Sequence, residues 1–363
     1  MALPIVGLIY IIWSAIKIYT LGFFALLRQI IQKHKAAEVK LHTGKVALVT
    51  GGTCGIGFHV SMGLVSKNVH VVMAGHSIQK GEDAITRIRE EYPNAKVDFL
   101  HLDLSSLKSV QTFVAKIKAR GLKVHVLVNN AGIMFAPYKE TVDELESHFQ
   151  VNYLSHLYLT QALIGILEDS ATEDCYARVI NVSSIVHNVG SLSLQSIGKR
   201  CSHCWEYSPH AAYANSKLYI TLSTWYLSEL FRQENQRVTV NAVHPGIVNT
   251  DLYKHVHPSI KWFLNLLAHF TYLTPSEGAD TILYLALSPD VERESGWYYD
   301  NCQKHKTCQL SYSEKDIKEM FTISTDIINS KIRRTHRCPY LFLPVQPNGR
   351  NHVSLFTHCL VTS

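Results

Sequence analysis

Cysteine is sparse in this chain, and its spacing is irregular. Eight cysteines in 363 residues are too few and too unevenly placed for the disulfide framework of a small secreted protein. The stretch Cys201-Ser202-His203-Cys204 resembles half of a metal site, but no second ligand pair follows it at the spacing that zinc sites use. A polar surface loop is the simpler interpretation. We therefore expect no metal, and a reducing compartment or mixed use of the thiols.

A dominant charge of one sign is also lacking in the central part of the chain. The formal charge of +6 comes from the two ends: residues 1–44 carry five Lys/Arg and one acid (+4), and residues 331–363 carry five Lys/Arg and no acid (+5). Residues 45–330 are left with a net charge of −3. A mildly acidic centre argues against a nucleic-acid partner, whose basic surface should lie on the folded part. Basic ends beside apolar segments indicate membrane contact.

The N-terminal segment is the longest apolar run. From Pro4 to Leu27 it is interrupted mainly by small residues and Lys17, and basic residues follow it. We predict a membrane anchor over 1–31 and a basic linker over 32–42. Lys17 would cost about 2.5–3.5 kcal/mol at mid-bilayer unless it snorkels, so a helix lying in the membrane interface is an alternative to a spanning one.

If this segment spans the membrane, the positive charge after it predicts a cytosolic catalytic domain, and we expect the membrane to be that of the endoplasmic reticulum. A cleaved signal peptide needs a basic stretch before the apolar run and a small-residue cleavage site after it, and neither is clear here. A secreted form released by such cleavage is the alternative that we weigh against the anchor.

Between the ends, short apolar runs alternate with helical patterns. We predict strands over 45–50, 69–74, 97–102, 124–128, 178–182 and 238–243, with helices between them. This order predicts one main α/β domain, a Rossmann-type doubly wound parallel sheet, over residues 43–325. We predict a basic tail over 326–363. From Lys331 onward it shows no helical or strand period, so we expect it to be poorly ordered and dispensable for chemistry.

A glycine cluster follows the first predicted strand. In Thr50-Gly51-Gly52-Thr53-Cys54-Gly55-Ile56-Gly57 the glycines permit a tight turn, let a pyrophosphate approach the backbone and leave the next helix's N-terminus free for the anion. A lone glycine cluster is no more than a flexible turn. The preceding strand and following helix favour dinucleotide binding here.

Further motifs follow in a fixed order. They are Asp103-Leu104, Asn129-Asn130-Ala131-Gly132, Asn152, Ser184, Tyr213-x-x-x-Lys217, and Pro245-Gly246 with Thr250. With the glycine cluster, these motifs resemble the short-chain dehydrogenase/reductase family over residues 43–325. Tyr207–Tyr213 and Val248–Asp251 are most similar to its X-linked dehydrogenase/reductase branch, followed by retinol-dehydrogenase-like enzymes. This resemblance implies an enzyme acting on lipophilic, polyprenol-, retinoid- or steroid-like alcohols and aldehydes or ketones.

The resemblance also implies roles for individual residues. It implies catalytic roles for Asn152, Ser184, Tyr213 and Lys217, and cofactor contacts from Gly51, Thr53, Gly55, Ile56, Gly57, His76, Asp103, Asn130, Tyr213, Lys217 and Thr250. Ser184 is chosen over Ser183 because the family motif uses the second serine of such a pair.

Hydride transfer creates an oxygen that must gain or lose a proton, which calls for a general acid/base. Tyrosine has an ordinary pKa of about 10 and needs help at neutral pH. Lys217 lies one helical turn after Tyr213, on the same face, where its ammonium stabilises the phenolate. Ser184 would polarise the substrate oxygen, and Asn152, by resemblance, would support a water chain to Lys217.

The cofactor is NADP and/or NAD. The second strand ends in Gly75-His76, without the acid that NAD-preferring enzymes present there, which favours NADP with NAD permitted.

The segment Pro258–Leu273 is rich in apolar and aromatic residues, which suits a lipophilic substrate pocket or a second membrane contact. A helix that completes the core is the alternative. A homo-oligomer is a further expectation of the family. A catalytically silent nucleotide-binding scaffold of the same fold is the alternative function.

Overall fold

A parallel sheet runs through the centre of the molecule. The computed structural model describes residues 2–32, 34–36, 39, 41–199, 207–249, 271–305 and 311–333. In this part the sheet has eight strands in the order β3-β2-β1-β4-β5-β6-β7-β8. They are β1 (Val46–Thr50), β2 (His70–Gly75), β3 (Val97–His101), β4 (Val126–Asn129), β5 (Ala177–Val182), β6 (Val238–His244), β7 (Tyr298–Asp300) and β8 (Gln303–His305).

The predicted doubly wound α/β fold is confirmed. Strands β1 to β7 pair in parallel, and β8 returns antiparallel to β7 at the edge. The six strands expected from the apolar runs are all present. The strands β7 and β8 were not predicted, because three residues each are too few to leave an apolar run or an alternating pattern.

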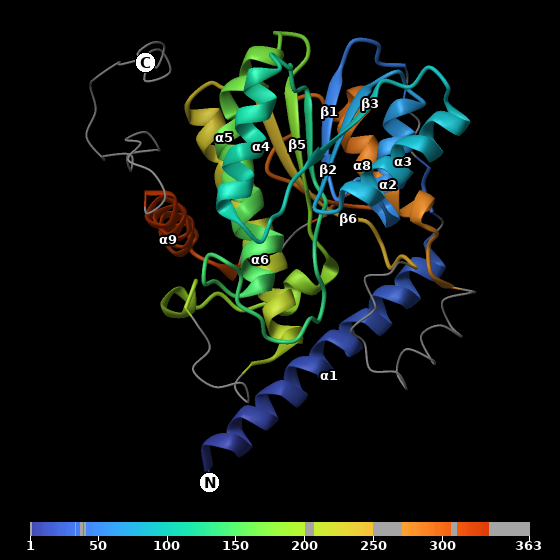
Figure 1. Cartoon of the computed structure of the whole chain (residues 1–363). Coiled ribbons are helices and arrows are strands. Elements are labelled where there is room, and N and C mark those ends of the chain that lie inside the picture. The colour runs from blue at the N-terminus through green and yellow to red at the C-terminus, as the bar shows by residue number, and fades with distance from the viewer. Residues whose placement is uncertain are drawn as a thin grey trace.

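Helices cover both faces of the sheet, as Figure 1 shows. Helices α2 (Gly55–Val65), α3 (Ile78–Glu91) and α8 (Pro275–Leu287) lie on one face, and α4 (Leu107–Ala119), α5 (Ser155–Ser170) and α6 (Pro209–Gln233) on the other. Each face has its own buried apolar cluster. Because β5 and β6 are buried along their whole length, the strand ends that carry the site are held between two packed layers.

The boundary predicted at residue 325 is wrong. Helix α9 (Glu314–Arg333) continues through it, and Ile328 and Ile332 are buried in the same cluster as Ile317 and Phe321. Apolar residues recurring every three or four positions give this helix one core-facing side. Residues 326–333 are therefore part of the folded domain, and the rest of the predicted tail lies outside the described residues.

The N-terminal helix α1 (Ala2–Ile31) lies against the end of the domain where the site is found (Figure 1). Its segment Ile5–Ile31 is long and apolar enough to cross a membrane. However, α1 also contacts α6 and the short helix η2 (Ile185–Val189). The expected anchor is thus one helix that is also packed on the catalytic domain.

Candidate active site

The turn after β1 is shaped by its glycines. Gly51 and Gly55 have φ angles of +63° and +54°, which favour glycine. A Cβ on Gly57 would lie 2.2 Å from the carbonyl oxygen of Gly51 and 2.4 Å from Nδ2 of Asn130. Helix α2 begins after Cys54, whose side chain makes no capping hydrogen bond. The first N–H groups of α2 and a turn bare of side chains fit the pyrophosphate of a dinucleotide.

A buried hydroxyl fixes this turn to the neighbouring strand. The Oγ1 of Thr50 accepts hydrogen bonds from the backbone N–H groups of Asn130, at 2.9 Å, and Ala131, at 3.0 Å. In return, Nδ2 of Asn130 donates to the carbonyl oxygen of Thr50, at 2.9 Å. The side chain of Asn130, expected to contact the cofactor, therefore holds the glycine turn in shape.

His156, on α5, connects the turn to the catalytic residues and was not predicted. Its Nε2 lies 2.9 Å from Thr50 Oγ1, and its Nδ1 lies 3.0 Å from the carbonyl oxygen of Asn152. Burial lowers the pKa of His156 to about 4, so the ring is neutral at physiological pH. Because the Asn152 oxygen only accepts, Nδ1 carries the proton and Nε2 accepts from the Thr50 hydroxyl. A single histidine on an apolar helix face gives no sequence signal for this connection.

Asn152 lies in a stretch of π-helix, η1 (Phe149–Leu154). Its Nδ2 donates to the carbonyl oxygen of Ile133 and to Oγ of Ser216, both at 3.0 Å, and its Oδ1 accepts from the N–H of Ile133, at 2.8 Å. A Cβ on Gly132 would meet Oδ1 of Asn152 at 3.1 Å and Nζ of Lys217 at 3.8 Å. The extra residue of the π-helix thus directs Asn152 toward the loop after β4 and toward Lys217.

Ser184, Tyr213 and Lys217 lie together where β5 ends against α6. Interaction with the Ser184 hydroxyl lowers the pKa of the Tyr213 phenol, and Nζ of Lys217 lies 5.7 Å from the centroid of the Tyr213 ring. Nζ of Lys217 donates to the carbonyl oxygen of Val182 at 2.8 Å. Ser183, the competing serine, turns away and bonds the carbonyl oxygen of Lys217 and the hydroxyl of Thr221.

Burial sets the protonation of this group. It raises the pKa of Tyr213 to about 12, which the bond from Ser184 opposes, and it lowers the pKa of Lys217 to about 8. At neutral pH the phenol therefore holds its proton while the amine is still largely charged. A buried acid beside a cation can give a proton to a substrate oxygen or take one back.

The other expected cofactor residues surround the same edge of the sheet. Thr53 lies in the glycine turn, 3.8 Å from where a Cβ on Gly75 would stand, and Ile56 lies 3.4 Å from where a Cβ on Gly278 of α8 would stand. His76 is exposed just after β2. The Asp103 carboxylate accepts hydrogen bonds from the N–H and hydroxyl of Ser105, so it shapes the loop before α4. Thr250 and residues 251–270 lie outside the described residues, as does Cys201–Cys204.

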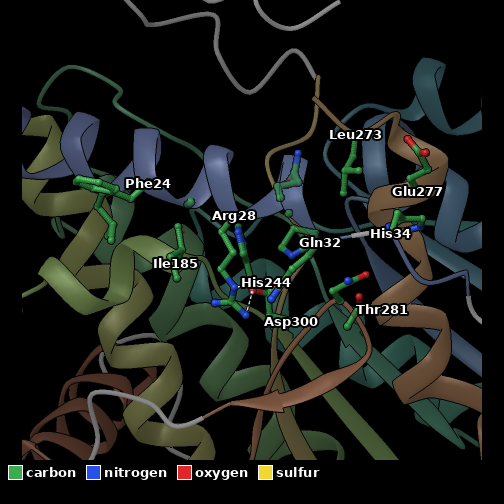
Figure 2. Close-up of a pocket in the computed structure, with 16 residues that line it drawn as sticks. Phe24, Arg28, Gln32, His34, Ile185, His244, Leu273, Glu277, Thr281 and Asp300 are labelled. Atoms are coloured by element: carbon green, nitrogen blue, oxygen red, sulfur yellow. Dashed lines mark hydrogen bonds and ion pairs between the residues drawn. The ribbon is translucent and has the colours of Figure 1, made fainter. Parts of the chain in front are cut away.

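A cavity of about 210 Å³ opens at the carboxyl ends of β6 and β7 (Figure 2). It is bounded by Ile185, which follows Ser184, by His244 of β6 and Asp300 of β7, and by side chains of α1. Ligands of open α/β sheets bind outside the carboxyl ends of the strands. The fold and site together define a dinucleotide-dependent enzyme in which Ser184 adjoins a buried tyrosine and lysine.

Comparisons with known proteins identify the family. Residues 45–196 match the family model described as short chain dehydrogenase. The polyprenol dehydrogenase of Homo sapiens is 38% identical over 318 residues, covering 86% of this chain and 95% of that protein. Retinol dehydrogenase 12 of Homo sapiens is 35% identical over 285 residues, covering 78% of this chain and 86% of that protein.

Solved structures agree with this assignment at the level of the fold. The Pseudomonas aeruginosa RhlG/NADP complex aligns with a TM-score of 0.57 and 24% identity, covering 71% of this chain and 94% of that one. The chain therefore belongs to the short-chain dehydrogenase family and is an NAD(P)-dependent oxidoreductase. When bound, the nicotinamide of its cofactor supplies or accepts the hydride.

Proposed function

We propose that this enzyme interconverts a lipophilic, membrane-dissolved alcohol and its aldehyde or ketone, with Tyr213 as the acid/base. The observation that carries the proposal is the interaction of the Ser184 hydroxyl with the buried phenol of Tyr213, with the buried Lys217 beside the phenol ring. A cavity lined by the apolar helix α1 reaches Ile185, the residue next to Ser184. A silent scaffold would have no need to keep a phenol and an amine buried together at this cost in desolvation.

Each residue then has a separate task. Ser184 orients the substrate oxygen, and Tyr213 passes a proton to it or takes one from it. Lys217 favours the phenolate through its charge. Asn152, held by Ile133 and Ser216, lies on the side from which a water chain would refill Lys217. The residues of the glycine turn, with Asn130, His76, Asp103 and Thr250, are the proposed cofactor contacts.

The substrate class follows from the relatives and from α1. Polyprenol dehydrogenases and retinol dehydrogenases act, by name, on lipophilic alcohols. Within the family, Tyr207–Tyr213 supports the X-linked dehydrogenase/reductase branch. We propose an isoprenoid-type alcohol as substrate. NADP is the proposed preferred cofactor, because His76 follows β2 where an NAD-preferring enzyme would present an acid.

We propose that the enzyme works at the endoplasmic reticulum membrane with its catalytic domain in the cytosol. Ser14 and Ile18 are buried against the domain, whereas Ile5, Ile16 and Phe23 are 60%, 49% and 58% exposed. One apolar side is thus left for lipid, which favours a helix in the interface over a spanning one. Protease protection of the domain in sealed microsomes would contradict the cytosolic orientation.

A homo-oligomer stays a prediction of the family resemblance.

The experiment is turnover of polyprenyl, retinoid and steroid alcohols and aldehydes by vesicle-bound protein with NADP and with NAD. Tyr213→Phe should reduce kcat by about 10²- to 10⁴-fold, because it removes the proton donor and keeps the ring. Tyr226→Phe is the matched control, since Tyr226 lies on the same helix and packs on Phe321, with ring centroids 4.7 Å apart.

Turnover of one lipid class that depends on Tyr213 supports the proposal. Cofactor binding without turnover of any alcohol or aldehyde overturns it in favour of the scaffold. A lower Michaelis constant for NAD than for NADP overturns the cofactor preference alone.

A further inference from the structure

Helix α1 has two different sides, although its composition is apolar throughout. Ser14, Ile18, Leu21, Ala25 and Gln29 recur every three or four residues and therefore share one face. Of these, Ser14 is 8% and Ile18 is 5% exposed, and the other three are half-buried. This face lies on the catalytic domain.

The middle of that face reaches the residues around the catalytic tyrosine. Ile18 belongs to a buried cluster with Phe135 and Tyr213. The ring of Tyr19 lies 5.4 Å from that of His210, one helical turn before Tyr213. The Phe135 ring packs edge-to-face on Tyr213 at 5.3 Å. The N-terminal helix is therefore one layer of side chains away from the proton donor.

The end of α1 is fixed to the loop that follows β6. Nε2 of Gln29 donates to the carbonyl oxygens of Ile247, at 3.2 Å, and Thr271, at 3.0 Å, and its Oε1 accepts from the N–H of Ile247, at 2.8 Å. Arg28 pairs with Asp300 at 3.5 Å, and His34 with Asp280 at 2.7 Å. These bonds hold α1 as part of the domain, which a flexible tether would not need.

The cavity beneath α1 is lined by both apolar and polar side chains. The apolar ones are Leu21, Phe24 and Ala25 of α1 with Ile185 and Leu273, and we call them the rim. Figure 2 shows Arg28 reaching down from α1 toward His244 and Asp300. His244 is buried, burial lowers its pKa, and its Nδ1 has no hydrogen-bond partner among the described residues.

An amphiphile matches this arrangement, with its alcohol or carbonyl end on the side of the cavity where Ile185 adjoins Ser184, and its chain against α1. Sites that enclose a drug-sized ligand measure about 300–1,000 Å³. The cavity of about 210 Å³ is smaller, so it holds a head group and the first carbons of a chain. The rest of a long chain must leave past Phe24, which is 61% exposed on the apolar side of α1.

We propose that α1 is a wall of the substrate site and selects for long-chain alcohols through Leu21, Phe24 and Ala25. This inference rests on the proposed function. The membrane-facing helix then has two tasks, since it holds the enzyme at the lipid and guides the chain of the substrate between lipid and Tyr213. Gln29 is a positioning residue that keeps this wall against the loop after β6.

The test compares two substitutions to phenylalanine on opposite sides of α1. Ala25→Phe fills the rim, and Ile16→Phe adds a ring to the outer side, where Ile16 is 49% exposed. Full-length protein in phosphatidylcholine vesicles is assayed with a long and a short isoprenoid alcohol. We expect Ala25→Phe to reduce the long-to-short ratio of kcat/KM by about tenfold, and Ile16→Phe to leave it within about twofold.

Cofactor binding, followed by fluorescence, establishes that each variant is folded. If Ala25→Phe fails to bind cofactor, Leu21→Ala takes its place, and the ratio should rise because the rim is widened. An unchanged ratio in a folded rim variant overturns the proposal while the wild type still turns over alcohol. Absence of turnover by the wild type overturns the proposed function itself, so the two failures are distinguishable.

Discussion

The two ends of the proposed active site are held in opposite ways. At the turn after β1, the proposed cofactor contact depends on missing side chains, since a single Cβ on Gly57 would collide with the backbone of Gly51. At the end of β5, it depends on side chains that are buried at a cost, with Tyr213 and Lys217 both 5% exposed or less. The cofactor end is thus limited by space and the catalytic end by electrostatics, so substitutions should fail differently at each.

Among effects on binding and stability, the largest is expected at the turn. Gly57→Ala should weaken cofactor binding by about a hundredfold, since forcing atoms into a packed contact costs up to about 3 kcal/mol. Gly165→Ala is the control, because a Cβ there meets nothing within 4 Å, and it should slightly stabilise helix α5. Titration of cofactor fluorescence measures both. Normal affinity in Gly57→Ala would contradict a turn limited by space.

A smaller effect is expected where the two ends meet. Thr50→Val keeps the shape of the side chain but leaves the N–H groups of Asn130 and Ala131 and the Nε2 of His156 without their partner. The free energy of unfolding should fall by about 2 kcal/mol, and Thr50→Ser should restore most of it. Urea denaturation monitored by fluorescence tests this. Equal losses in both variants would indicate that the methyl group matters and the hydroxyl does not.

The smallest effect is a pH dependence at the catalytic end. The pKa of Lys217 is about 8 in the folded protein and about 10.5 unfolded, so above pH 8 the unfolded chain holds a proton that the folded chain releases. The stability of wild type relative to Lys217→Met should therefore rise between pH 8 and 10, by about 1 kcal/mol per pH unit. Above pH 10 buried tyrosines, including Tyr213, act in the opposite direction, because the unfolded chain loses their protons first. A flat difference between the two proteins from pH 8 to 10 would be inconsistent with a buried amine.

Motif residues were predictable because backbone geometry demands particular residue types. Only glycine suits the turn at Gly51 and Gly57, and a catalytic tyrosine needs a cation one helical turn away to stabilise its phenolate. Both motifs are therefore recognisable from residue types at short separations along the sequence. His156 and Ser216 gave no such signal, since His156 contacts Thr50 and Ser216 contacts Asn152 across a long stretch of sequence. The π-helix around Asn152 was equally hidden, because no residue type specifies it.

Helix α1 illustrates a different limit. Its length and composition predicted an apolar helix correctly, but uniform apolarity conceals which side packs on protein and which is left for lipid. By contrast, the amphipathic spacing of Ile317, Phe321 and Ile328 was visible in the sequence, and the boundary at 325 was set too early. Tertiary contacts decide which side of α1 packs on the protein and where the folded domain ends. These contacts join residues far apart in the sequence, so no short sequence pattern indicates them.

If α1 guides the substrate from the membrane as proposed, the substrate concentration that matters for this enzyme is the one in the membrane. A substrate that enters along a membrane-facing helix is searched for in two dimensions, so its mole fraction in the bilayer sets the rate, not its amount per volume of cytosol. Adding inert lipid should slow the enzyme even though no molecule of substrate has been removed. A cell could therefore regulate such an enzyme through the area and composition of one membrane, without any change in the protein.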